Sequence, residues 1–62
     1  MKLYIIIKKK YYVTEYNENI CYDKCIEFIC TDIIKLAEKL KELSSKKNYH
    51  IVYSLENYDM EE

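Results

Sequence analysis

Three cysteines and a single histidine are the residues of this 62-residue sequence with the most specific chemistry. Together they could supply the four ligands of a structural zinc ion, and they are Cys21, Cys25, Cys30 and His50. On a helix, Cys21 and Cys25 share a face and Cys30 points away from it, and the sequence has no Cys-x-x-Cys pair. Because a free cysteine is also a good small core residue, this spacing predicts packing and not a metal site.

No residue pattern in the sequence is typical of an active site. A Cys–His nucleophile needs the two side chains in contact and a third group that orients the base, whereas His50 alternates with apolar residues as a surface strand residue does. Two carboxylate pairs have the spacing of a solvated helix face: Asp23 with Glu27, and Glu38 with Glu42. The sequence has no glycine, which excludes a glycine-rich phosphate loop. We therefore expect a protein that is not an enzyme, with no catalytic residue, no metal and no cofactor.

The length and composition predict one small cytosolic domain. A chain of 62 residues forms one domain at most, and such a chain buries only about 60% of the surface that its unfolded form exposes. The formal net charge is −1, so the electrostatic field of the whole chain does not attract nucleic acid. The basic residues are all lysine, so the chain also lacks the arginine side chains that bind phosphates and bases with two hydrogen bonds. The apolar run at residues 3–7 is too short for a signal-peptide core or a membrane span. We expect a cytoplasmic protein with reduced cysteines and no membrane partner.

Short runs of β-branched and aromatic residues predict the strands. Residues 2–8 and 11–16 should form a hairpin around the charged break Lys8-Lys9-Lys10, and residues 49–55 alternate as a final strand. Residues 55–62 then form an acidic tail. The chain is expected to be a single small α+β domain of ββαβ order, with one long amphipathic helix packed on a three- or four-stranded sheet.

The most regular pattern is an apolar stripe with alternating spacings of four and three residues: Tyr22, Ile26, Ile29, Ile33, Leu36, Leu40 and Leu43. This heptad spacing predicts one helix from about residue 20 to about residue 45, with the stripe facing the core. An alternative interpretation starts the helix at Thr31-Asp32, because either residue can cap it. Residues 25–30 would then be another strand, as their β-branched residues suggest, and the helix would span residues 32–45.

The remaining apolar residues suggest surfaces for a partner. The residues expected to face the helix are Leu3, Ile5, Ile7, Val13, Ile51 and Tyr53. The residues then left without cover are Tyr4, Ile6, Tyr12, Tyr16 and Val52 on the far face of the sheet, and Phe28 and Ile34 on the helix flanks. Since monomers seldom expose a large contiguous apolar patch, these residues indicate a protein-binding or self-association face. The alternative is that tyrosines simply cover a thin core.

In size and composition the sequence resembles the small proteins, rich in Lys, Tyr, Ile and Asn, of phages and mobile elements in AT-rich bacteria. Many of these proteins are inhibitors, among them anti-CRISPR proteins, which bind a larger host protein or nucleoprotein complex. The resemblance implies a non-enzymatic protein–protein interaction module in the bacterial cytosol. Such a module blocks a host defence effector by occupying its surface, in some cases as a homodimer.

The expected binding residues fall into two groups. Aromatic residues would contribute the contact energy: Tyr4, Tyr12, Tyr16, Phe28 and Tyr58. Acidic residues would steer the chain to a basic partner surface: Glu56, Asp59, Glu61 and Glu62. One alternative is a nucleic-acid-binding accessory protein that uses Lys8-Lys9-Lys10 and nearby tyrosines, and another is a structural homodimer. The acidic residues and the lack of arginine make direct nucleic-acid binding the weaker expectation.

Overall fold

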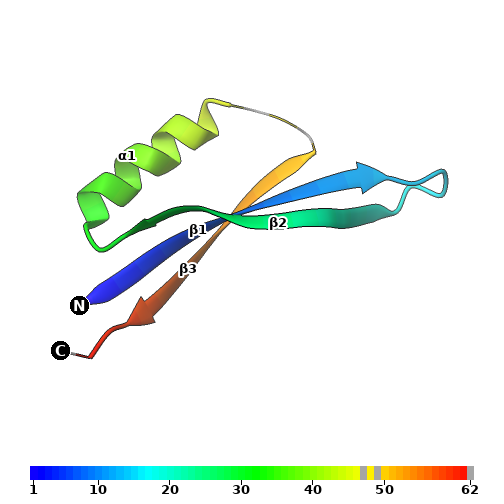
Figure 1. Cartoon of the computed structure of the whole chain (residues 1–62). Helices are drawn as coiled ribbons and strands as arrows, with labels where there is room; N and C mark the ends of the chain where they lie inside the picture. The colour runs from blue at the N-terminus through cyan, green and yellow to red at the C-terminus, as the bar shows by residue number, and fades with distance from the viewer. Residues whose placement is uncertain (47, 49, 62) are drawn as a thin grey trace.

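Three antiparallel strands form a sheet in the order β2-β1-β3, and one helix lies against one of its faces (Figure 1). The computed structural model describes residues 1–46, 48 and 50–61. The elements are β1 (Lys2–Val13), β2 (Asn19–Cys30), α1 (Ile33–Ser44) and β3 (Ile51–Asp59). This arrangement confirms the α+β class and the ββαβ order, with three strands in the described part of the chain.

The first strand is one long element that does not stop at the three lysines. β1 continues through Lys8, Lys9 and Lys10, and each of them pairs with both neighbouring strands. The expected hairpin turn at these lysines is therefore wrong, and the chain reverses at residues 14–18 instead. Successive strand residues face opposite sides, so the half-buried lysine stems lie along both faces of the sheet while their charged ends reach water.

Residues 19–30 form a strand and not the first half of a long helix. β2 pairs with β1 over its length, which corrects the helix expected from residue 20. The β-branched and aromatic side chains of this segment favour a strand, and the neighbouring strand satisfies its backbone hydrogen bonds. The alternative helix over residues 32–45 is close to α1, which begins after Asp32. The Asp32 carboxylate caps it by accepting a 2.9 Å hydrogen bond from the N–H of Ile34.

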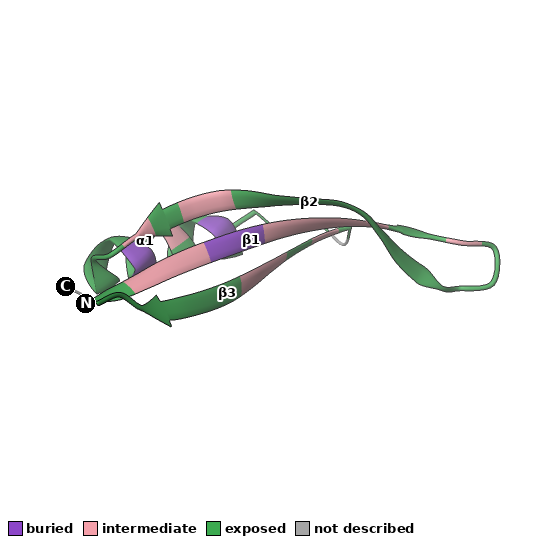
Figure 2. Cartoon of the chain, turned by 60° about the horizontal axis from the view of Figure 1, so that its bottom comes forward, coloured by how far each residue is buried: buried purple, intermediate pink, exposed green. Residues whose placement is uncertain are grey.

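Two bulges interrupt the pairing of β1 with β2. A register shift beside Ile6 and Ile7 leaves Glu27 as an extra residue of β2, and a second shift leaves Tyr22 unpaired in the same way. Bulges bend a strand and increase its local twist. The hairpin twists accordingly towards its distal end (Figure 2).

The last strand is longer than expected and takes in much of the acidic segment. β3 runs to Asp59, so Glu56 and Asp59 are strand residues beside β1 and not part of a free tail. The N–H of Met60 donates to the carbonyl oxygen of Met1 at 2.8 Å and extends this contact. Residue 49, where the strand was expected to start, and Glu62 lie outside the described residues.

A few residues on one side of the sheet form the core. Ile6 is fully buried, and Leu36 and Leu43 of α1 are each 5% exposed (Figure 2). Half-buried residues pack around these three: Tyr4, Phe28, Cys30 and Tyr53. Because Ile6 faces the helix, the expected faces of β1 are reversed. The residues on the opposite side are Leu3, Ile5 and Ile7.

The helix buries only part of the stripe that predicted it. Leu36 and Leu43 are buried, whereas Leu40 is 36% exposed and Ile33 is 63% exposed. The expectation that the whole stripe faces the core is therefore wrong. Tyr22, Ile26 and Ile29 lie on β2, and within α1 only the two leucines at positions 36 and 43 are buried. No helix in the described part of the chain is long and apolar enough to cross a membrane.

Candidate protein-binding surfaces

The hairpin of β1 and β2 extends beyond the third strand as a two-stranded projection (Figure 1). β3 pairs with β1 only from Lys2 to Lys10, and at this boundary the N–H of Tyr11 donates to the carbonyl oxygen of His50 at 2.7 Å. Residues 11–22, here called the arm, lie past that boundary, and the molecule is 49 Å long in consequence. An isolated two-stranded hairpin is marginally stable in water, so the arm depends on its attachment to the sheet and on its turn.

Thr14 organises the turn at the tip of the arm. Its N–H donates to the carbonyl oxygen of Glu18 at 2.9 Å, and its own carbonyl oxygen accepts from the N–H of Asn17 at 3.1 Å. Its hydroxyl oxygen accepts from the N–H groups of Tyr16 and Glu18 at 3.3 and 3.1 Å. Asn17 has a φ of 61°, a left-handed conformation that Asn tolerates better than most residues. The turn thereby presents Tyr16, which is 84% exposed.

The arm has exposed apolar side chains and charge of one sign. Its exposed apolar residues are Tyr12, Val13, Tyr16, Ile20 and Tyr22. Its charged residues are Glu15 and Glu18, both exposed, and it contains no lysine, arginine or histidine. The next acidic residue, Asp23, already has a counter-charge, because its carboxylate lies 3.8 Å from the Nζ of Lys10. The arm is therefore an acidic, tyrosine-rich projection.

Tyrosines also surround a shallow depression at the base of the arm. The rings of Tyr12 and Tyr22 have centroids 5.8 Å apart with their planes tilted by 47°. Tyr11 and His50 complete the lining of the depression. Tilted aromatic pairs at this distance stabilise each other. A shallow, mainly aromatic surface suits an apolar protein side chain better than a charged small molecule.

The sheet face opposite the helix is a second apolar surface, called here the open face. Its apolar residues are Leu3, Ile5, Ile7, Ile26, Ile29, Val52 and Tyr58. Ile7 at the centre is only 7% exposed, because Ile26 of β2 and Ser54 of β3 flank it. Ile26 and Ile29 beside it are 60% and 50% exposed. No other described element covers this face (Figure 2).

The structure distributes the predicted aromatic residues over three places. Tyr12 and Tyr16 lie on the arm, and Tyr58 lies on the open face; all three are exposed. Tyr4 and Phe28 are half-buried against the core, so the expectation that they lie on an uncovered surface is wrong.

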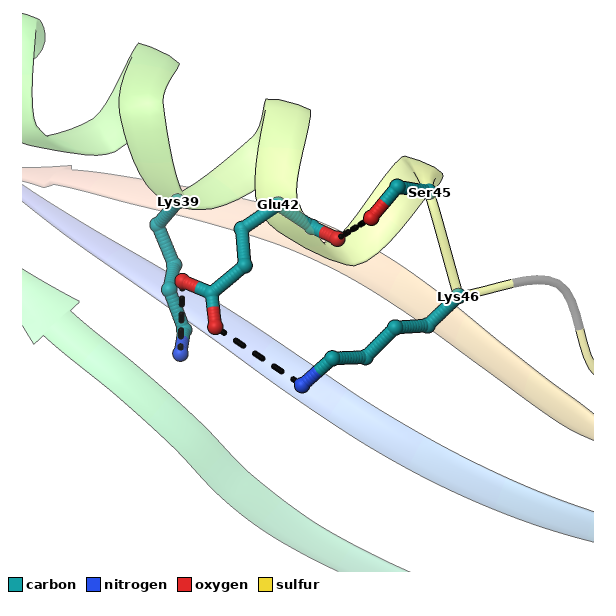
Figure 3. A network of polar contacts seen from close by, with 4 residues as sticks. All are labelled: Lys39, Glu42, Ser45 and Lys46. Atoms are coloured by element: carbon teal, nitrogen blue, oxygen red, sulfur yellow. Dashed lines mark hydrogen bonds and ion pairs between the residues drawn. The ribbon is translucent and has the colours of Figure 1, made fainter.

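A small polar network joins Lys39, Glu42, Ser45 and Lys46 at the C-terminal part of α1 (Figure 3). The Nζ of Lys39 lies 5.6 Å from the centroid of the Phe28 ring and 3.6 Å from Oε2 of Glu42. Oε1 of Glu42 is 3.7 Å from the Nζ of Lys46, and the Glu42 carbonyl oxygen accepts from the Ser45 hydroxyl at 2.6 Å. Exposed ion pairs contribute little stability each. The Nζ of Lys39 lies over one face of the half-buried Phe28 ring, at a distance that allows a cation–π contact.

Three of the predicted acidic residues lie at the end of the molecule opposite the tip of the arm: Glu56 and Asp59 on β3, and Glu61 just after it (Figure 1). Glu56, Asp59 and Glu61 are all exposed. Oε2 of Glu56 accepts a hydrogen bond from the Tyr58 hydroxyl at 3.0 Å. This hydrogen bond and the negative charge of Glu56 raise the pKa of Tyr58 above its ordinary value. These carboxylates and the arm tyrosines therefore do not form one site.

The three cysteines do not converge on a single position. Cys21 and Cys25 are exposed on β2, contrary to the expectation that they pack inside, while Cys30 packs against the core. All three are free thiols. Within the described ranges, no group of three or more His, Cys, Asp or Glu side chains could hold a metal ion.

The three consecutive lysines do not make one basic patch either. Lys8 and Lys10 face one side of the sheet and Lys9 faces the other, because strand residues alternate. Lys10 is also in contact with Asp23. The geometry therefore gives no continuous basic track for a nucleic-acid backbone along these residues.

Sequence patterns did not single out Glu15, Glu18 or Ile26 as surface residues of interest. A signal for the tip was present, since Thr14 and Asn17 are residue types that favour turns. The open face had no such signal, because the face of each strand depends on where the helix docks.

Comparisons with known proteins identify no relative of this chain. No protein-family model matches it, and no curated protein or solved structure is significantly similar to it. The arm and the open face are therefore the basis on which its function has to be inferred.

Proposed function

We propose that this chain is a non-enzymatic protein-binding module, which places its arm on a basic surface of a larger partner and blocks that surface. The composition of the arm carries the proposal: exposed tyrosines and two carboxylates, with no basic residue. Carboxylates speed the approach to a basic surface over distances of about 8 Å at physiological salt. Tyrosines then add contact area at low entropic cost.

The turn at the tip of the arm has a defined conformation in the free chain, which supports a role in binding. Hydrogen bonds to Thr14 and the left-handed Asn17 hold the turn in one shape, with Tyr16 exposed. A segment that is already ordered loses less conformational entropy on binding. A narrow arm can also enter a groove that the wider sheet cannot.

The acidic charge favours a protein as the partner over a nucleic acid. A two-stranded β-ribbon has the right width for the DNA major groove. Phosphates would, however, repel Glu15 and Glu18, and the arm has no lysine to offset them. A basic groove that normally holds nucleic acid is the complementary surface. A nuclease or nucleoprotein complex of a host defence system, the target class suggested by the chain's size and composition, offers such a groove.

A capture experiment from native host lysate tests the proposal. The bait is the wild-type chain, beside a variant with Glu15→Gln and Glu18→Gln and a matched control with Glu27→Gln and Glu38→Gln. The control removes the same charge from positions outside the arm. We expect a basic protein to be retained by the wild type and the control after nuclease treatment. Its association rate with the arm variant should be about tenfold lower at low salt.

The nucleic-acid alternative makes the opposite predictions. Capture would then be lost on nuclease treatment, and the chain alone would bind a single-stranded oligonucleotide in fluorescence anisotropy at low salt. Replacing the three lysines by glutamine would abolish that binding. Loss of capture on nuclease treatment, or binding of the oligonucleotide by the chain alone, would rule out a basic protein as the target of the arm. Equal association rates for the wild type and the arm variant would rule it out too.

A further inference from the structure

We infer that the open face is the interface of a symmetric dimer, in which a second copy of this chain covers it. The inference goes beyond the proposed function and is independent of it, because the arm and the open face share no residue. It follows from the small size of the core, the apolar character of the face and the area that the face offers.

The core on the helix side is small. The buried apolar residues of the described chain are Ile6, Leu36 and Leu43 on this side and Ile7 on the open face. One core supplies little stability in domains below about 70–80 residues, and many of them add disulfides, a metal or self-association. The cysteines are free, and the described residues contain no metal-binding group. Self-association is the remaining source of buried apolar surface.

A second copy of the chain can cover the open face at all times, because it is present whenever the chain is made. A partner met only occasionally would leave the open face in water for the rest of the time. In a two-fold symmetric dimer the open faces of the two copies contact each other, so their apolar centres pack together. The charged residues of the face lie around that centre: Lys9, Lys24 and Glu56. With a chain net charge of −1, two copies do not repel each other strongly.

The area of the face agrees with a dimer of low affinity. β1 pairs with β3 over residues 2–10. At about 3.3 Å per residue and about 4.8 Å between strands, the face measures about 30 by 14 Å, or about 400 Å² of flat footprint. Two faces with this footprint bury about 800 Å² in total, which is below the standard size of specific interfaces and in the range of weak, transient ones. We therefore expect a dissociation constant in the micromolar range.

Sedimentation equilibrium of the intact chain at about 1 to 100 μM tests the inference. The wild type should approach twice its 7.6 kDa mass as the concentration rises. Ile26→Lys places a charge at the centre of the interface and should raise the dissociation constant by about thirtyfold or more. Ile34→Lys is the matched control, since Ile34 is 67% exposed on the helix and Ile26 is 60% exposed on the open face. The control should sediment as the wild type does.

Thermal unfolding of the wild type gives a second test that needs no variant. Its midpoint should rise with protein concentration, because dimerisation stabilises the folded chain by mass action. A wild-type monomer at 100 μM with a midpoint independent of concentration would overturn the inference and leave the face uncovered or taken by another protein. A dimer that Ile26→Lys does not weaken would also overturn it, since the contact would then lie elsewhere, for example along the edge of β2.

Discussion

The hydrogen bond from the N–H of Tyr11 to the carbonyl oxygen of His50, 2.7 Å long, marks the point where the three-stranded sheet becomes a two-stranded arm. Up to Lys10, β1 has a strand on each side, and beyond Tyr11 it has only β2. A central strand that loses one neighbour also loses half of its cross-strand contacts. Stability should therefore fall along β1 from the core towards the tip.

Hydrogen exchange should show this gradient directly. Backbone amides in residues 11–22 should have protection factors at least about tenfold lower than the hydrogen-bonded amides of residues 4–8. The physical reason is that the arm can open without disturbing Ile6 or the helix. Exchange followed by NMR or mass spectrometry measures it. Equal protection in both segments would mean that the arm is held by contacts outside the chain, as in an oligomer that includes it.

Asn17 should be the most sensitive position of the arm to backbone constraint. Asn17→Val should lower the free energy of unfolding by about 1–2 kcal/mol, because a β-branched residue resists the left-handed conformation. Asn17→Gly should cost little, since glycine adopts this conformation freely. Urea denaturation measures both, with Asn19→Val as the control at a strand position. Equal losses for Val at positions 17 and 19 would contradict the turn geometry.

Two leucines four residues apart on the helix should differ in their contribution to stability. Leu36→Ala should cost about 2–5 kcal/mol of unfolding free energy, because it opens a cavity beside the fully buried Ile6. Leu40→Ala should cost clearly less, because Leu40 is 36% exposed while Leu36 is 5% exposed. Thermal or urea unfolding of the two variants measures this difference, since both substitutions remove the same atoms. A larger loss for Leu40 would mean that the helix is rotated about its axis relative to this structure.

Tyr58 should titrate at higher pH than an ordinary tyrosine. The hydrogen bond to Glu56, and then the charge of that carboxylate, favour the neutral phenol and raise its pKa. The stabilisation is present below the unfolded pKa of about 10 and is lost as the pH rises through the higher folded value. NMR titration of the Tyr58 ring measures the shift, and Glu56→Gln should lower it towards the ordinary value. An unchanged Tyr58 titration in that variant would show that the hydrogen bond does not form in solution.

Several elements of the fold could be predicted from the sequence because their signals are local. Alternation and β-branching predicted strands at both ends of the chain. The apolar spacing predicted a helix from about residue 20 to about residue 45, of which residues 33–44 are helical. Asp32 was recognised as a potential cap, which it is.

The candidate site could be predicted only in part. Tyr12 and Tyr16 were expected on an exposed surface, and they are exposed. Their position on an acidic arm was not predicted, because the turn was expected at Lys8-Lys9-Lys10, where three like charges suggested the end of a strand. Pairing with strands on both sides keeps these lysines in β1. This pairing could not be predicted from local sequence patterns, because the paired strands are distant in the sequence.

The sequence by itself determined the α+β class, the ββαβ order and the presence of a helix over its leucine-rich segment, but not where that helix begins. These features rest on the preferences of a few adjacent residues. Tertiary structure alone decided the state of residues 20–30, whose apolar spacing suits a helix and whose β-branched residues suit a strand. It also decided which face of β1 meets the helix. Ile5, Ile6 and Ile7 are apolar on both faces, so alternation cannot choose between them, and the docking of Leu36 and Leu43 onto Ile6 makes the choice. The open face exists because that docking covers one side of an apolar strand and leaves the other side bare.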